Sequence, residues 1–334
     1  MIGGAGFIGH SLALRFNSLG AEVSVIDSLQ VNNFLNYISA RSGDENGDLY
    51  RKIINQRLNR LRKADVTLHI QDCRDYHLIQ GIMDKVNPDV VIHLAAVAHA
   101  DKSNRDPYST FDHSFRTLEN SLDCSRERNI HFIYFSSSMV YGNFNGGFVS
   151  EESPCEPLGI YGALKFGGEK LVVAYNQVFD MKYTIVRPSA LYGERCVSRR
   201  VGQVFIENAI RGIEISVKGD GSDKLDFTYI DDFVEGMVKI VENENSENET
   251  FNLTYGESQS LEKMIDILRV KFPDVKINHY PKDKLMPDRG TLSIAKAKRL
   301  LNYDPKWPLE EGFVKYIEWY KGLFFSDSES KEKL

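Results

Sequence analysis

Short apolar stretches alternate with longer amphipathic ones along the first half of the chain. Each apolar stretch is rich in β-branched or aromatic residues and is flanked by turn formers, which is typical of buried strands. We predict strands at residues 21–27, 66–70, 89–96, 130–137 and 183–188. Helical stretches lie between most of them. This order predicts an α/β fold with a doubly wound parallel sheet that is covered by helices on both faces.

One connection in this alternation, residues 32–64, is longer than a simple crossover. Within it, Ile54, Leu58 and Leu61 recur at the spacing of one helix face, so we expect an added helix rather than an unstructured loop. After residue 188 the alternation loosens into shorter elements. These predict a smaller, mixed α/β cap over one edge of the sheet.

The chain opens with the glycine pattern of a dinucleotide-binding turn, in the stretch MIGGAGFIGH. Gly3 would permit the tight turn, Gly6 the close approach of backbone to a pyrophosphate, and Gly9 the close packing of the following helix. That helix starts near Phe7 and Ile8, and its free N–H groups would face the phosphates. The sequence therefore predicts a Rossmann-like cofactor site at this turn.

Only Met1 and Ile2 precede the glycine turn. They can supply just the last residues of a strand that typically has about five. We expect a protein that still binds the cofactor but is less stable than it could be. We also expect the given start to lie downstream of a natural one.

Two carboxylates follow predicted strands. Asp27 ends the strand after the glycine turn, where a carboxylate can accept both ribose hydroxyls of adenosine and repel a 2′-phosphate. No arginine is evident beside it, so the sequence favours NAD over NADP. Asp72 follows the next strand and could reach the adenine amino group, and its neighbour Cys73 is assigned to the same site. Asp27 could instead be a helix cap or turn residue, and Asp72 a turn former.

A second motif lies in the stretch GIYGALK, where Tyr161 and Lys165 are one helical turn apart. A lysine ammonium there would lower the pKa of Tyr161 from about 10, so that the phenolate could remove a proton from a hydroxyl. The stretch FSSSMVYG ends the preceding strand at the carboxyl edge of the sheet, where such folds bind ligands. A serine there can hydrogen-bond the same hydroxyl. The Tyr-x-x-x-Lys spacing alone also arises by chance in many chains.

The composition of the chain excludes several classes of function. The formal net charge is −6, with no basic stripe for nucleic acid, and no apolar run approaches the length of a membrane span. The four cysteines are far apart and form no metal-binding cluster, which predicts free thiols in a reducing cytoplasm and no metal site.

These motifs together resemble the extended short-chain dehydrogenase/reductase family, in its NAD-dependent nucleotide-sugar epimerase and dehydratase branch. The resemblance covers nearly the whole chain and is carried by GGAGFIG, VIDSL, PDVVIHLAA, FSSSMVYG, YGALK, IVRPSALYG, GDGSDKLDFTYIDD and IAKAKRLLNYDP. It implies that Ser137 is a catalytic residue, that Tyr161 is the acid and base, and that Lys165 is both its partner and a ribose ligand. The wall of the NAD site would include Leu94, Ala95 and Ala96.

The resemblance also implies a domain division and an assembly. Residues 1–188 would form the NAD-binding domain, which the chain re-enters near 226–255. Residues 189–330 would form mainly the substrate-binding cap. The helices near 107–127 and 160–180 would pair in a homodimer.

Within this branch, 4,6-dehydratases carry an Asp-Glu pair after the catalytic residue, and decarboxylases keep the Glu. Ser138 and Met139 stand at these positions here. Methionine cannot exchange a proton, so the dehydratase and decarboxylase reactions are both disfavoured. Of the remaining members, the chain most resembles the UDP-sugar 4-epimerases, which act on C4 through a 4-keto intermediate. A dehydratase, a decarboxylase, a ketosugar reductase and a non-catalytic NAD-binding protein remain alternatives.

The chain departs from the family pattern at two positions that usually hold the substrate diphosphate, and Ser114 stands where many members have an active-site Asn. The family often has Asn at the position of Ala190 and Arg at that of Leu225, and both usually hold the substrate diphosphate. Arg200 and Arg289 are candidate replacements, because a guanidinium suits phosphate oxygens. Either could instead be a solvated surface arginine. The substrate-binding set assigned from the sequence is Ser138, Ser189, Arg200 and Arg289.

Overall fold

The computed structural model describes residues 1–38, 45–98, 100–282 and 286–325 of the chain. Its centre is a parallel sheet in which every predicted strand is found, although each is shorter than predicted. The strands of this sheet are β1 (Ser24–Ile26), β2 (Thr67–His69), β3 (Val90–His93), β4 (His131–Phe135), β6 (Tyr183–Arg187) and β11 (Glu249–Asn252).

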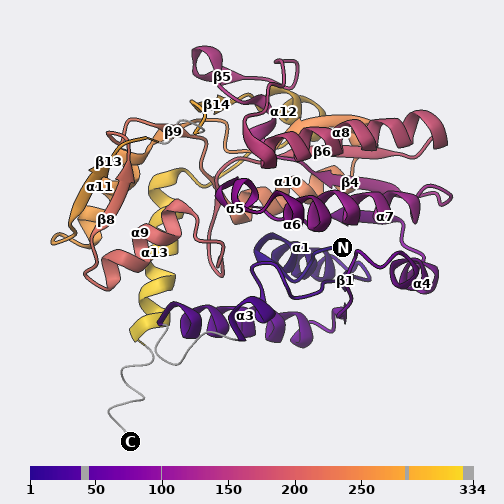
Figure 1. The fold of residues 1–334 in the computed structure, drawn as a ribbon, viewed down its shortest axis with the longest axis horizontal. Helices are drawn as coiled ribbons and strands as arrows, with labels where there is room; N and C mark the ends of the chain where they lie inside the picture. Colours follow the sequence, from indigo (N-terminus) through magenta and orange to yellow (C-terminus); the bar gives the residue numbers. More distant parts are fainter. Residues whose placement is uncertain (39–44, 99, 283–285, 326–334) are drawn as a thin grey trace, which may run out of the picture.

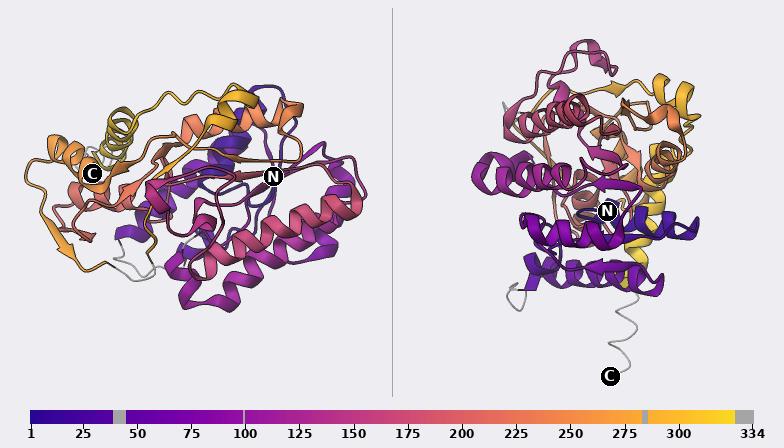
Figure 2. Two further views of the ribbon diagram at one scale, coloured as in Figure 1. Left: turned by 90° about the horizontal axis from the view of Figure 1, so that it is seen from above. Right: turned by 90° about the vertical axis from the view of Figure 1, so that its right-hand side faces the viewer.

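Helices cover both faces of this sheet, as the pattern predicts. α7 and α8 lie on one side, and α1 and α10 lie on the other (Figures 1 and 2). The helices associated with the sheet are α1 (Phe7–Ser18), α4 (Tyr76–Val86), α5 (Ala100–Arg105), α6 (Pro107–Phe111), α7 (Thr117–Asp123), α8 (Gly159–Phe179), α10 (Ile230–Val241) and α12 (Ala295–Leu301).

The first strand of the fold is reduced to a single bridging residue. Ile2 forms parallel bridges to Ile26 on one side and to His93 on the other. Its N–H donates to the carbonyl of Ile92 at 2.9 Å, and its own carbonyl accepts from the N–H of Leu94 at 2.8 Å. Ile2 therefore joins the β1–β2 pair to the rest of the sheet, and the strand order becomes β2–β1–Ile2–β3–β4–β6–β11.

This order places the glycine turn at the point where the winding of the chain reverses direction. Ligands of doubly wound sheets bind in the crevice at such a switch point, outside the carboxyl ends of the strands. Gly3 follows Ile2 directly, and its N–H donates to the carbonyl of Ile26 at 2.7 Å. The bridge through Ile2 thus fixes the turn against the neighbouring strand.

The long connection after β1 contains the short helix α2 (Phe34–Ile38) and the predicted added helix, α3 (Glu45–Lys63), which runs along the lower side of Figure 1. Ile54 and Leu61 of the predicted stripe are buried, and Leu58 is half-buried. The side chain of Arg57 lies on the same stripe and is also buried.

Most of the segments after β6, apart from those that return to the central sheet, form a smaller, mixed part of the fold, much of which is seen at the left of Figure 1. It is built from short strand pairs and three longer helices. The pairs are β7 (Leu191–Tyr192) with β10 (Thr228–Tyr229), β8 (Ile215–Lys218) with β13 (Ile277–Tyr280), and β9 (Lys224–Leu225) with β12 (Gln259–Ser260). A fourth pair joins β5 (Phe148–Val149), which precedes β6, to β14 (Thr291–Leu292) toward the top of Figure 1. The helices are α9 (Val201–Ile210), α11 (Leu261–Lys271) and α13 (Leu309–Phe325).

Among the described residues, no helix combines the length and the apolar character that crossing a membrane requires.

Candidate functional site

A pocket of about 410 Å³ opens at the carboxyl edge of the sheet, a size within the usual range for small-molecule sites. Every site residue assigned from the sequence lines it, although the lining alone does not test their roles. The lining includes Gly3, Gly6, Phe7, Ile8, Gly9, Asp27, Asp72, Cys73, Leu94, Ala95, Ala96, Ser137, Ser138, Tyr161, Lys165, Ser189, Arg200 and Arg289.

The glycine turn has the geometry that the sequence predicts for an anion cradle. Gly3 has a positive φ of 77°, and a Cβ there would lie 2.7 Å from the Ala95 nitrogen. A Cβ on Gly9 would lie 2.5 Å from the Gly4 Cα, so larger residues would push the start of α1 away from the turn. No described side chain caps α1 at Gly6, which leaves its first N–H groups facing the pocket. The turn therefore fits a pyrophosphate.

Asp27 lies beside this turn with its carboxylate already oriented. One oxygen accepts from the Ala5 N–H at 2.9 Å, and the other accepts from the Leu29 N–H at 2.7 Å. Burial raises the pKa of Asp27, while these two bonds and the charge of Arg57 lower it. Each oxygen keeps a lone pair for a ribose hydroxyl. The arginine corrects the sequence analysis, which found none beside Asp27.

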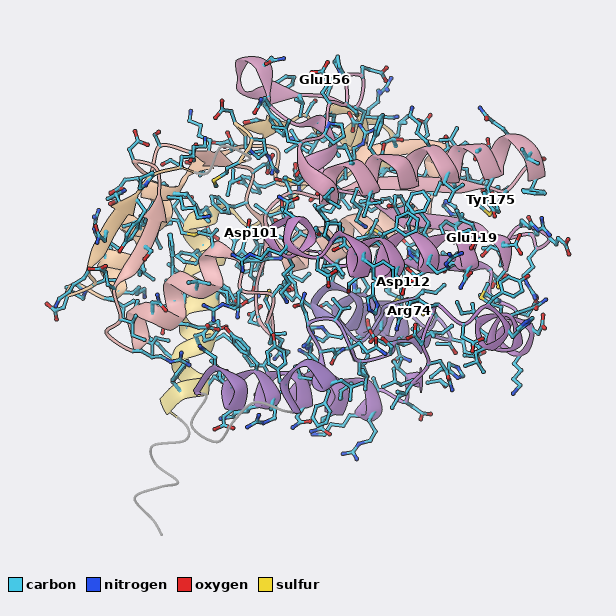
Figure 3. All side chains as sticks on the ribbon, in the orientation of Figure 1. Arg74, Asp101, Asp112, Glu119, Glu156 and Tyr175 are labelled. Carbon is cyan, nitrogen blue, oxygen red and sulfur yellow. The ribbon has the colours of Figure 1, made fainter. Side chains whose placement is uncertain are left out.

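Asp72 also reaches the pocket, but its carboxylate is already paired. Arg74 donates to it at 2.6 Å and to Asp112 at 2.7 Å, so a single guanidinium joins two segments (Figure 3). This guanidinium lowers the pKa of Asp72. Gln30 donates to the same carboxylate at 3.3 Å. A contact between Asp72 and an adenine amino group stays a prediction, because the bound arginine competes for the same oxygens.

Ser137 and Tyr161 meet where β4 and α8 converge. Ser137 follows β4, and its hydroxyl accepts from the Met139 N–H at 3.2 Å. Tyr161 lies in the first turn of α8. Burial raises the pKa of Tyr161, while hydrogen bonding by Ser137 and the charges of Arg200 and Arg289 lower it. The serine and the phenol can therefore engage one substrate hydroxyl together.

Lys165 lies one turn along α8, but its ammonium points to the sheet. Its Nζ donates to the Phe135 carbonyl at 2.5 Å and lies 5.0 Å from the ring centre of Tyr134. Burial lowers the pKa of Lys165 to about 8, and the charge of Glu169 opposes that shift. The helical spacing suggests that Lys165 lowers the pKa of Tyr161, whereas in this structure the nearby cations that do so are two arginines. The role of Lys165 as partner stays a prediction.

A buried ion pair joins α8 to the end of β6. Arg187, at the end of β6, donates to both oxygens of Glu169 on α8, at 2.9 and 2.7 Å. The Arg187 guanidinium also donates to the Tyr141 hydroxyl at 2.8 Å, and the Ser136 hydroxyl donates to Glu169. Each guanidinium nitrogen and each carboxylate oxygen has a hydrogen-bond partner, which offsets the loss of hydration of the two charges. The pair fixes α8 against the carboxyl end of the sheet.

Arg289 reaches the pocket from a segment distant in sequence. Its guanidinium donates to the Ser189 hydroxyl at 3.1 Å and to the Ser138 hydroxyl, and it contacts the sulfur of Met139 at 3.0 Å. Burial lowers the pKa of Arg289 to about 10, which leaves it charged near neutral pH. Neither its Nε nor that of Arg200 has a hydrogen-bond partner among the described residues. Both side chains line the pocket, so their positive charge can attract an anionic ligand there.

Ala190 and Leu225, the two departures at expected diphosphate-binding positions, also line this part of the pocket. Ala190 has a φ of 35°, in the left-handed region that asparagine adopts more readily than alanine. The backbone thus keeps a conformation suited to asparagine although its side chain is absent.

The sequence analysis missed Arg57 as a pocket residue. The sequence feature that could have identified Arg57 is its position on α3, where it shares the apolar stripe with Ile53, Ile54 and Leu61. A charged residue on a buried helix face needs a partner, and its location at the pocket becomes apparent only when the helix is placed.

Comparisons with known proteins show which family and fold this chain resembles. The model of the NAD dependent epimerase/dehydratase family matches residues 1–254. An uncharacterized UDP-glucose epimerase of Bacillus subtilis, YtcB, is 32% identical over 253 residues, which cover 74% of this chain and 77% of that protein.

Two solved structures share the fold over almost the whole chain. UDP-glucuronic acid 4-epimerase of Bacillus cereus, in complex with UDP-glucuronic acid and NAD, has a TM-score of 0.85 and 25% identity, covering 96% of this chain and 98% of that one. UDP-glucose 4-epimerase of Thermotoga maritima, with UDP-glucose, has a TM-score of 0.83 and 26% identity, covering 97% and 98%. These likenesses confirm the Rossmann-like α/β fold.

Proposed function

Because the chain belongs to the NAD dependent epimerase/dehydratase family, we propose that it epimerises the sugar of a nucleotide-diphosphate sugar. The reaction would take place at C4 through a 4-keto intermediate. One observation carries the proposal. Ser137, Tyr161 and Lys165 line the pocket, while the only carboxyl groups of the described residues that line it are Asp27 and Asp72. Both follow strands on the far side of the glycine turn, so neither of these carboxylates stands beside Tyr161.

The residues present fit NAD as the cofactor. The glycine turn and the start of α1 would hold the pyrophosphate, and Asp27 would accept the adenosine ribose hydroxyls. When bound, NAD would accept hydride from one sugar carbon and return it to the same carbon. Lys165, which lines the same pocket, would donate to the nicotinamide ribose.

Residues of the chain itself would carry out the proton transfers. Ser137 would hydrogen-bond the sugar hydroxyl and orient it toward the Tyr161 oxygen, which takes the hydroxyl proton as the ketone forms. In the second half-reaction Tyr161 would return this proton to the oxygen. A dehydratase must also remove a proton from a neighbouring carbon and lose water. Ser138 and Met139 cannot act as the acid and base for that step, which favours epimerisation.

The substrate diphosphate would lie between Arg200 and Arg289. These cations come from segments after β6 and line the same pocket, and a guanidinium suits phosphate oxygens. Holding the substrate by its diphosphate would leave the keto sugar free to present either face.

The decisive experiment is incubation of the purified chain with UDP-, GDP-, CDP- and dTDP-sugars, followed by anion-exchange separation. We expect one sugar nucleotide to convert to an isomer of equal mass, without consumption of added nicotinamide cofactor. A product lacking water or carbon dioxide would identify a dehydratase or a decarboxylase. Stoichiometric cofactor use would identify a ketosugar reductase. Tight NAD binding without turnover of any sugar nucleotide would identify a non-catalytic protein.

The substitution Arg289→Met is expected to raise the KM for the sugar nucleotide about 10- to 100-fold, because a charge-assisted bidentate contact with phosphate is lost. NAD affinity should stay unchanged. Arg269→Met serves as the matched control, because this arginine pairs with Glu262 and Asp266 on the exposed face of α11. Steady-state kinetics and NAD titration provide the measurements. Equal KM values for the two variants would remove Arg289 from the substrate site.

We also propose a homodimer through α6, α7 and α8. Large hydrophobic side chains are exposed on α6 and α8, with Tyr108 at 85%, Phe111 at 47% and Val178 at 71% exposure. Light scattering during gel filtration should give twice the chain mass, and the double variant Tyr108→Glu/Val178→Glu should give the monomer mass. A monomer for the unaltered chain would contradict this assembly.

The domain division and the compartment remain part of the proposal. Pairing of β11 with β6 supports a return of the chain to the NAD-binding domain within 226–255, with 1–188 as its first part and 189–330 as mainly the cap. The cysteines of the described residues are free thiols, which supports a cytoplasmic setting.

A further inference from the structure

Arg57 has no part in the chemistry proposed above, yet it lines the same pocket. It lies on the buried stripe of α3 and is only 1% exposed. Its Nε has no hydrogen-bond partner among the described residues. Its Nη2 donates only a long bond, 3.4 Å, to the carbonyl of Asn32, which also lines the pocket. The guanidinium is thus buried and largely unsatisfied.

Such a group is costly unless a ligand completes it. A buried charge without hydrogen-bond partners lowers the stability of the folded state. Asp27 attracts the Arg57 charge, but no ion pair joins Arg57 to a carboxylate within the described ranges. An apolar residue would fill this stripe at lower cost. The site that would use the free donors is the part of the pocket next to Asp27.

We propose that Arg57 is a cofactor-binding residue that donates to the adenosine ribose beside Asp27 and allows the site to accept a 2′-phosphate. The inference rests on the proposed NAD site, but not on the identity of the sugar or on the epimerase reaction. With Arg57 in the site, the expected ratio of NAD affinity to NADP affinity is smaller than the ratio that Asp27 alone predicts. The chain should bind NADP within about thirtyfold of NAD, whereas a site with a carboxylate alone would reject it more strongly.

The local chemistry supports this pairing of an acid with a base. Asp27 is held by two backbone N–H groups and has its pKa raised by burial, so its charge is partly offset before any ligand binds. A guanidinium presents parallel donors that match phosphate oxygens. With NAD the same donors can reach ribose oxygens. Asp27 and Arg57 would thus supply an acceptor and a donor to one sugar.

The test is calorimetric titration of the full chain, freed of bound nucleotide, with NAD and NADP at fixed ionic strength. In Arg57→Gln we expect NADP affinity to fall at least about thirtyfold and NAD affinity about three- to tenfold, because the phosphate loses a charged partner. Arg57→Lys should recover part of the NADP affinity. The control is Arg60→Gln, on the exposed side of the same helix, which should change neither affinity.

The melting temperature without ligand separates binding from a structural role. A binding role predicts that Arg57→Gln melts no lower than the unaltered chain, because an unsatisfied buried charge is removed. A lower melting temperature with an unchanged ratio of NAD to NADP affinity would overturn the inference. If no variant folds, the proposal is tested by ligand binding to the unaltered chain. Adenosine 2′,5′-bisphosphate should bind within about tenfold of 5′-AMP, and binding more than about a hundredfold weaker would overturn the proposal. Binding of neither dinucleotide would overturn the cofactor site itself.

Discussion

Replacing Tyr161 with phenylalanine is expected to lower kcat at least about a hundredfold, the low end for loss of general acid–base catalysis. The phenol oxygen would be the group that takes and returns the hydroxyl proton, and the described residues offer no carboxylate beside it to take over. Phenylalanine fills nearly the same volume, so the fold should remain. Turnover of the identified sugar nucleotide, NAD titration and melting temperature provide the measurements.

A matched control lies on the same helix. Tyr175 is near the outer end of α8, away from the pocket lining (Figure 3). Tyr175→Phe should retain normal kcat and NAD affinity. If Tyr161→Phe turned over substrate at a rate close to that of the Tyr175→Phe control, Tyr161 would not be the acid and base.

The variant Arg187→Met is expected to lose about 3–5 kcal/mol of unfolding free energy, because it leaves the Glu169 carboxylate buried without its cation. The exposed fractions of the two side chains are 7% and 4%, so water cannot replace the lost partner. Thermal unfolding should show a melting temperature lower by at least about 5 °C. NAD binding should weaken too, because Glu169 no longer fixes α8.

Two further variants make this result specific. The exposed pair of Lys182 with Glu247, at 2.9 Å, has side-chain exposures of 46% and 27%, and Lys182→Met should cost no more than about 1 kcal/mol. Adding Glu169→Gln to Arg187→Met should recover part of the loss, because no buried charge is then left unpaired. If Arg187→Met lost as little unfolding free energy as Lys182→Met, the buried ion pair would not have this stabilising role.

Much of the fold could be predicted from the chain because its signals are local. The strand at 131–135 is a short apolar run between turn formers, and the stripe on α3 repeats at helical spacing. The two-residue strands of the smaller part carry no such period. Their pairing, such as β5 with β14, depends on contacts between segments far apart in the chain.

The same limit applies to the site. Glycine spacing and the Tyr-x-x-x-Lys spacing are local, so the residues around the cofactor turn could be assigned from the sequence. The direction of the Lys165 ammonium could not, because it depends on the Phe135 carbonyl of another element. The contacts of Arg289 with Ser138 and Ser189 likewise join segments 151 and 100 positions apart.

Helix α8 carries Tyr161, Lys165 and Glu169 at four-residue intervals, so one rigid rod sets the position of the phenol, the ammonium and the buried carboxylate. This arrangement makes the helix tolerant of substitution on its outer face but intolerant of changes in length. One residue inserted between 161 and 169 would turn the groups before it by about 100° relative to those after it and shift them by about 1.5 Å. The phenol would then leave the pocket while the carboxylate kept its arginine. Insertions and deletions in relatives of this chain should therefore accumulate in the loops after β6, which the proposal assigns to substrate binding, and be absent from the first half of α8.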